Sequence, residues 1–117
     1  MAALAHDMRQ YKRFKVPQEG LLVGRLDDDL IVEIVDLSTG GIAMKAGSRL
    51  SVGREYFMRI HDRKNKLEVR GTVVRSQILE NRQTVVGKGG PVYASAMRLH
   101  EGAEDRVADF ICDTLLV

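Results

Sequence analysis

The sequence contains one cysteine, Cys112, and no tryptophan. A single cysteine excludes an intramolecular disulfide, a zinc site built on several cysteines and a C-x-x-C redox motif. Aromatic residues make up only 5% of the chain. This argues against a small barrel that binds single-stranded nucleic acid, because such proteins stack bases on aromatic side chains. We rank that function last, and no nucleic acid polymer is expected as a partner.

Long apolar runs and a strong excess of one charge are also missing. No segment approaches the roughly 20 apolar residues that a membrane helix needs, and the opening MAALAHDM lacks the features of a signal peptide. The net charge is only +2 over 117 residues, so the total charge selects no class of partner. These absences predict a cytoplasmic protein without membrane insertion, and the length predicts one domain.

Motifs of common enzymes and metal sites are absent too. His6, His61 and His100 show neither H-x-x-x-H nor H-E-x-x-H spacing, so we expect no metal site. The stretch GKGG at 87–90 is not followed by the Lys-Ser or Lys-Thr of a phosphate loop, which favours a hairpin loop. Ser38 has no histidine near it in the sequence that would activate it as a nucleophile. We therefore expect no catalytic activity.

Short apolar runs separated by turn residues follow Pro17, a pattern typical of a small antiparallel β-protein. The runs predict about six strands, at 20–26, 30–38, 42–46, 54–61, 66–80 and 91–100. Gly40 and Gly41 allow a tight reversal after the second run, because glycine accepts positive φ. The apolar phase of the fifth run slips after Gly71, which predicts a bend or bulge there. Six strands in so short a chain favour a closed barrel, because closure removes exposed strand edges.

The C-terminal segment has the period of a helix. Its apolar residues recur at helical spacing, at Val107, Phe110, Ile111 and Leu115. Two acidic residues, Glu104 and Asp105, lie where they complement the helix dipole. We expect one amphipathic helix whose apolar stripe packs on the barrel, with part of the stripe open to a partner. Cys112 is expected to be partly buried beside that stripe.

Two polar motifs interrupt this pattern. RQYKR at 9–13 provides two arginines within a stretch whose charged residues are all basic. DLSTGG at 36–41 places Asp36 and Ser38 two apart on a strand, so their side chains share one face. A carboxylate accepts hydrogen bonds from the N1–H and N2–H₂ edge of guanine, whereas an arginine matches phosphate oxygens and the O6/N7 edge. A hydroxyl serves either base or phosphate, and glycine permits close approach. Together the motifs predict a site for a guanine-phosphate ligand.

With these motifs the chain resembles the PilZ family of cyclic di-GMP receptors over about residues 8–115. The resemblance rests on R-x-x-x-R at Arg9 and Arg13, followed by D-x-S-x-x-G at Asp36, Ser38 and Gly41. AMRLH at 96–100 is similar to the closing strand of the family, in which a basic residue precedes an apolar one. The resemblance implies a mainly β fold, with a flexible basic arm at 1–17. A small six-stranded antiparallel PilZ-type β-barrel and one C-terminal α-helix follow at 18–117.

The resemblance also implies a role for each motif residue. Arg9 and Arg13 would hold phosphates and guanine edges from the arm, while Asp36 and Ser38 bind a guanine from the barrel and Gly41 keeps the turn open. Four further residues are candidate secondary contacts: Met8, Lys12, Gly40 and Arg98. Many members begin the first motif with a doubled arginine, whereas Met8 precedes Arg9 here, which favours one bound ligand over a stacked pair. The ligand is cyclic di-GMP, and no other cofactor is implied.

Two functions compatible with this barrel stay open. The first is a bacterial second-messenger receptor or adaptor, whose arm becomes ordered on the nucleotide and which signals to a downstream protein partner. The second is a PilZ-fold module that binds proteins but no nucleotide. In that case RQYKR is a solvated basic tail, and Asp36 and Ser38 bond local backbone in an ordinary hairpin. A thermal shift with cyclic di-GMP would distinguish the first function from the second.

Overall fold

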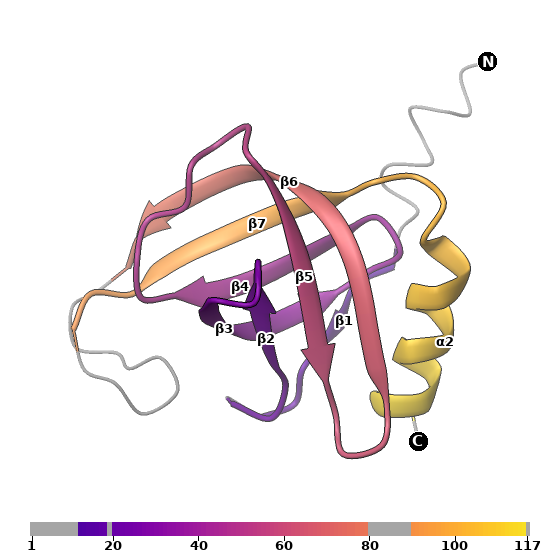
Figure 1. The fold of residues 1–117 in the computed structure, drawn as a ribbon. Helices are drawn as coiled ribbons and strands as arrows, with labels where there is room; N and C mark the ends of the chain where they lie inside the picture. The colour runs from indigo at the N-terminus through magenta and orange to yellow at the C-terminus, as the bar shows by residue number, and fades with distance from the viewer. Residues whose placement is uncertain (1–11, 19, 80–89, 117) are drawn as a thin grey trace.

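The computed structural model describes residues 12–18, 20–79 and 90–116. These residues form antiparallel strands followed by one helix (Figure 1). The elements are β1 (Phe14–Lys15), β2 (Val23–Leu26), β3 (Leu30–Leu37), β4 (Gly41–Ala46), β5 (Glu55–His61), β6 (Lys66–Ile78), β7 (Tyr93–Leu99) and α2 (Glu104–Thr114).

The strands β2 to β7 form a closed barrel. Hydrogen-bonded neighbours follow the order β3, β2, β5, β6, β7 and β4, and β4 pairs back with β3. The predicted six-stranded antiparallel barrel with a C-terminal helix is therefore confirmed. The two-residue strand β1 adds to β3 beyond the end of β2, with Lys15 opposite Asp36. This short strand lies inside the range 1–17 that the sequence predicts to be an arm.

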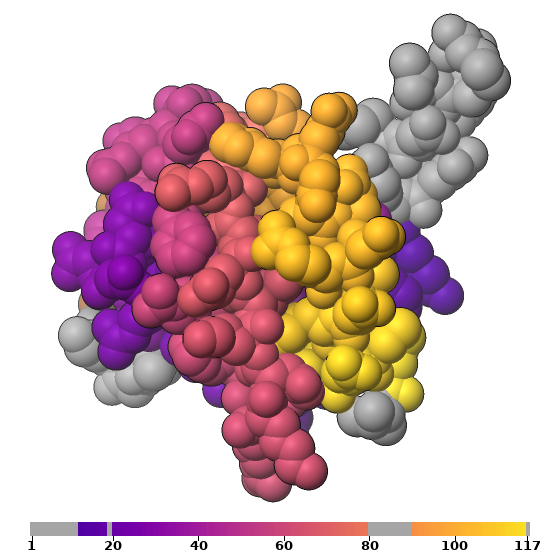
Figure 2. Space-filling model, turned by 45° about the vertical axis from the view of Figure 1, so that its right-hand side comes forward, coloured from indigo at the N-terminus to yellow at the C-terminus, as the bar shows by residue number. Residues whose placement is uncertain are grey.

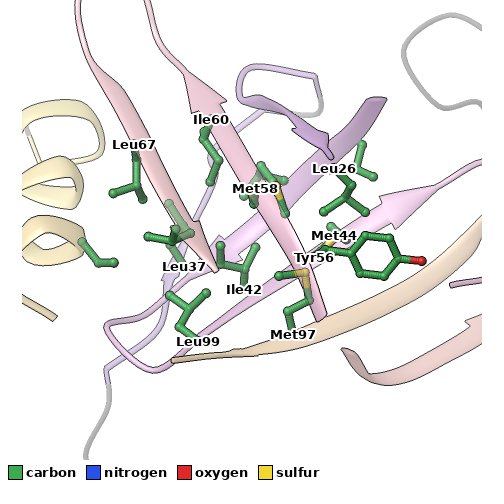
Figure 3. Close-up of a cluster of buried hydrophobic side chains, with 14 of the residues drawn as sticks. Leu26, Leu37, Ile42, Met44, Tyr56, Met58, Ile60, Leu67, Met97 and Leu99 are labelled. Carbon is green, nitrogen blue, oxygen red and sulfur yellow. The ribbon is translucent and has the colours of Figure 1, made fainter. Parts of the chain in front are cut away.

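The interior of the barrel is filled by apolar side chains from all of the longer strands (Figure 3). β5 illustrates why the sequence folds in this way. Its residues Tyr56, Met58 and Ile60 are buried and alternate with more exposed neighbours, because successive side chains of a strand point to opposite faces. This alternation fixes which face of each strand points inward, and it leaves Asp36 of β3 partly exposed and Arg98 of β7 exposed.

The helix α2 covers one side of the barrel along β6 (Figures 1 and 2). Val107, Phe110 and Ile111 are buried against the core and Leu115 is partly buried, which confirms the predicted apolar stripe. The expected partial burial of Cys112 is wrong, because this residue lies beside the stripe and its side chain is exposed. α2 has neither the length nor the apolar character needed to cross a membrane, and no other helix occurs in the described residues.

Two register shifts interrupt the ladders of the barrel. One lies between Ile34 and Asp36 in the β3–β4 ladder, and the other between Val73 and Arg75 in the β6–β7 ladder. The second is the irregularity that the sequence predicts near Gly71, although it occurs further along β6. A bulge of this kind bends its strand and changes the direction of the side chains around it. Both shifts lie close to the polar motif residues described next.

Gly71 has a separate role in packing β7 against β6. A Cβ atom at this position would lie 2.9 Å from the carbonyl oxygen of Arg98 and 2.7 Å from the Cε atom of Met97. Real Cβ atoms essentially never come this close to a backbone oxygen, so a side chain at position 71 would push the two strands apart. The glycine therefore holds β7 in the position from which Arg98 projects.

Candidate ligand-binding site

The turn between β3 and β4 is built around the hydroxyl group of Ser38. Its Oγ accepts hydrogen bonds from the backbone N–H groups of Gly40, at 3.2 Å, and Gly41, at 3.0 Å. It also lies 3.3 Å from the carbonyl oxygen of Gly41, to which it donates, and Ser38 is only 2% exposed. This is the local backbone bonding that the sequence offers as the alternative to a ligand contact. A direct contact between Ser38 and a ligand stays a prediction.

Replacing Ser38 with alanine should lower the free energy of unfolding by roughly 1 to 2 kcal/mol, because two backbone N–H groups of the turn lose their acceptor. Urea denaturation measures this change. Ser48→Ala is the matched control, since Ser48 is exposed and its hydroxyl bonds no described residue. Equal midpoints for the two variants would show that the hydroxyl does not stabilise the turn.

Gly41 serves the site through close packing and not through an unusual backbone angle. In the described residues, the glycines with positive φ are Gly20, Gly53, Gly90 and Gly102. The predicted use of positive φ at Gly40 and Gly41 is therefore wrong. A Cβ on Gly41 would lie 3.0 Å from the carbonyl oxygen of Met97, so glycine lets β4 lie close against β7. Arg98 is the residue of β7 directly opposite Gly41.

The two sequence motifs meet in an ion pair between Arg13 and Asp36. The Nη1 atom of Arg13 lies 2.8 Å from Oδ1 of Asp36. The side chain of Arg13 is 59% exposed and that of Asp36 is 15% exposed. Such an exposed pair adds little to stability, but it sets the direction of the guanidinium group. Arginine has five N–H donors, so Arg13 keeps donors for a ligand while it contacts Asp36.

A pocket of about 250 Å³ opens beside this ion pair. Predicted site residues from the segment before β1, the β3–β4 turn, β4 and β7 line it, namely Arg13, Ser38, Gly40, Gly41 and Arg98. Asp36 is not part of the lining but is hydrogen-bonded to Arg13, which is. The volume is slightly below the roughly 300 to 1,000 Å³ of typical small-molecule pockets, so a dinucleotide would fill this hollow and extend beyond it. The turn between β3 and β4 and the end of β7 lie together in the fold (Figure 1).

The structure adds Arg75 to this set, a residue that sequence reasoning missed. Arg75 follows the register shift in β6 and lines the same pocket. Of the remaining predicted contacts, Lys12 lies over the ring of Phe14, 5.5 Å from its centre, and is not part of the pocket lining. Met8 and Arg9 lie outside the described residues.

One larger hollow in the described surface is less suited to an anion. A pocket of about 480 Å³ lies between β6 and the start of α2 and includes Glu68 and Glu101. These carboxylates disfavour an anion, and Arg106 already donates to the backbone carbonyl oxygen of Glu68. No group of three acidic, histidine or cysteine side chains that could hold a metal occurs in the described part of the chain. Chemistry therefore favours the smaller pocket as the place for a phosphate ligand.

Comparison with known proteins shows the family and the fold of the chain. The family model of the PilZ domain matches residues 7–93. No curated protein sequence matches the chain significantly. The fold is similar to that of the PilZ domain of YcgR from Escherichia coli, solved with cyclic di-GMP. The TM-score is 0.66 at 16% identity, over 90% of this chain and 89% of that one.

A longer structure of YcgR from Escherichia coli, also in complex with cyclic di-GMP, is similar with a TM-score of 0.62 and 17% identity. The match covers 90% of this chain but only 45% of that protein. The TM-scores show a common fold, and at identities this low the ligand of this chain has to be argued from its own residues.

Proposed function

The chain belongs to the PilZ domain family, and we propose that it is a receptor for cyclic di-GMP. The observation that carries this proposal is the ion pair of 2.8 Å between Arg13 and Asp36. These residues come from two motifs separated in the sequence, and the pairing of β1 with β3 brings them together beside a pocket that Arg13 lines. The alternative function, in which Asp36 bonds local backbone, does not predict this ion pair.

The chemistry of the two side chains suits different parts of the nucleotide. The carboxylate of Asp36 offers two acceptor oxygens, of which Oδ1 accepts from Arg13. Its other oxygen and the remaining lone pairs accept from the N1–H and N2–H₂ edge of guanine. The free N–H groups of Arg13 donate to a phosphate or to the O6/N7 edge of the base. Arg9 adds a second cation from the segment that precedes the described residues.

The position of Arg13 immediately before β1 suggests how ligand binding is passed on to the rest of the chain. Phe14 and Val16 pack against the core, and the N–H of Val16 donates to the carbonyl oxygen of Val35 at 2.9 Å. A nucleotide held by Arg13 therefore acts on the chain at the point where it enters the barrel. We propose that the segment before β1 folds over the ligand and that a downstream protein partner recognises this change. This role requires binding but no catalysis.

Isothermal titration calorimetry with cyclic di-GMP tests the proposal, with GTP as the control ligand. We expect micromolar or tighter binding of cyclic di-GMP, with a stoichiometry of one because Met8 replaces the first arginine of the doubled form. Absence of binding heat, together with absence of a thermal shift, would refute the receptor function. The protein-interaction module would then be the better description.

A further inference from the structure

Two arginines in the pocket are not explained by the two motifs. Arg75 and Arg98 are both exposed, and their side chains form no ion pair or hydrogen bond with any residue that the structure describes. Other exposed arginines, such as Arg63, likewise have no oxygen acceptor among the described residues, so Arg75 and Arg98 are distinguished by lining one pocket together. Two cations without protein partners on the wall of one pocket provide binding capacity for an anion.

The sheet brings these two arginines to the same side of the pocket. Arg75 lies opposite Ala96 in the β6–β7 ladder. Ala96 and Arg98 are two apart on β7, so their side chains lie on one face of the sheet. Arg98 is in turn opposite Gly41 of the β3–β4 turn. The register shift after Val73 belongs to this arrangement, because it sets which residue of β6 faces Ala96.

The floor between the arginines and the turn is open to close approach. Ala96 has a single methyl group and Gly41 has no side chain, and both line the pocket. Arg13 lines it as well and is joined to Asp36 on β3, whereas Arg75 and Arg98 project from β6 and β7. A ligand held at Asp36 and Arg13 therefore extends over small residues toward two further positive charges.

We propose that Arg75 and Arg98 form a second phosphate subsite, which binds the phosphodiester of cyclic di-GMP that Arg13 does not hold. This inference rests on the proposed function. A cyclic dinucleotide has two phosphodiester groups, and arginine binds phosphate oxygens through paired N–H donors. The subsite gives the protein a preference for a ligand with two phosphodiesters over a cyclic mononucleotide, which has one.

The experiment measures the affinities of Arg75→Gln, Arg98→Gln and the double variant for cyclic di-GMP and for cyclic GMP. Each single variant should bind cyclic di-GMP about tenfold more weakly, since one charge-assisted contact is lost. The double variant should lose more, while binding of cyclic GMP changes about twofold or less. Arg63→Gln is the matched control, because Arg63 is exposed outside the pocket and the substitution removes the same charge.

The outcomes separate the subsite from the receptor function. If the wild type binds cyclic di-GMP and the variants bind it equally well, the subsite is refuted and the receptor function stands. An equal loss for both nucleotides, or an equal loss in Arg63→Gln, would also refute the subsite, because general charge attraction would explain it. If the wild type does not bind cyclic di-GMP, both proposals fail.

Discussion

Arg13→Ala is expected to weaken binding of cyclic di-GMP about ten- to a hundredfold. Hydrogen bonds to a charged partner are worth roughly 1.5 to 3 kcal/mol, and a loss of 1.4 kcal/mol corresponds to a factor of ten. Arg13 is well placed for such a loss because its side chain is 59% exposed and lines the pocket, so most of its donors are available to a ligand. Calorimetric titration of the purified variant measures the change.

The control for this prediction separates binding from folding. Arg13 forms an exposed ion pair, and such pairs contribute about 0 to 1 kcal/mol to stability. Arg13→Ala should therefore keep a midpoint of urea denaturation near that of the wild type while its affinity falls. Arg63→Ala removes an exposed arginine outside the pocket and should leave the affinity unchanged. Wild-type affinity in Arg13→Ala would remove the main support for the receptor function.

Much of the fold could be predicted because its signals are local in the sequence. The alternation of Tyr56, Met58 and Ile60 follows from the period of a strand, and the spacing of Val107, Phe110 and Ile111 follows from that of a helix. Each pattern needs only its own segment to be recognised. The bulge in β6 could be placed only approximately, because its position depends on how β6 aligns with β7.

The site could be predicted only in part, since its residues meet through long-range pairing. The family resemblance implies that Arg13 and Asp36 contact one ligand, which stays a prediction, whereas the ion pair between them is found only in the structure. Arg75 has no local signal, because it enters the pocket only through the register of β6 against β7. The packing role of Gly41 was also hidden, since the carbonyl oxygen that it avoids belongs to Met97, far along the chain.

Asp36→Ala is expected to reduce affinity for cyclic di-GMP about ten- to a hundredfold, and its effect has two sources. The carboxylate accepts from the guanine edge in the proposed complex, and it also holds Arg13 in the free protein. Loss of either function weakens binding, so the affinity of this variant for one ligand does not separate them. A double-mutant cycle with Arg13→Ala measures the part that the two residues share.

Replacing guanine with adenine in the ligand distinguishes recognition of the base by Asp36 from positioning of Arg13 by Asp36. If Asp36 binds guanine, Asp36→Ala should bind cyclic di-GMP much more weakly while its affinity for cyclic di-AMP changes little, because adenine does not present the same two donors. Asp36→Asn should behave similarly, since an amide replaces one acceptor oxygen with an N–H₂ donor that faces the donors of guanine. If Asp36 only positions Arg13, both nucleotides should lose affinity by the same factor, because the phosphates that Arg13 binds are common to them. A wild-type preference for guanine in both variants would assign base recognition to another residue.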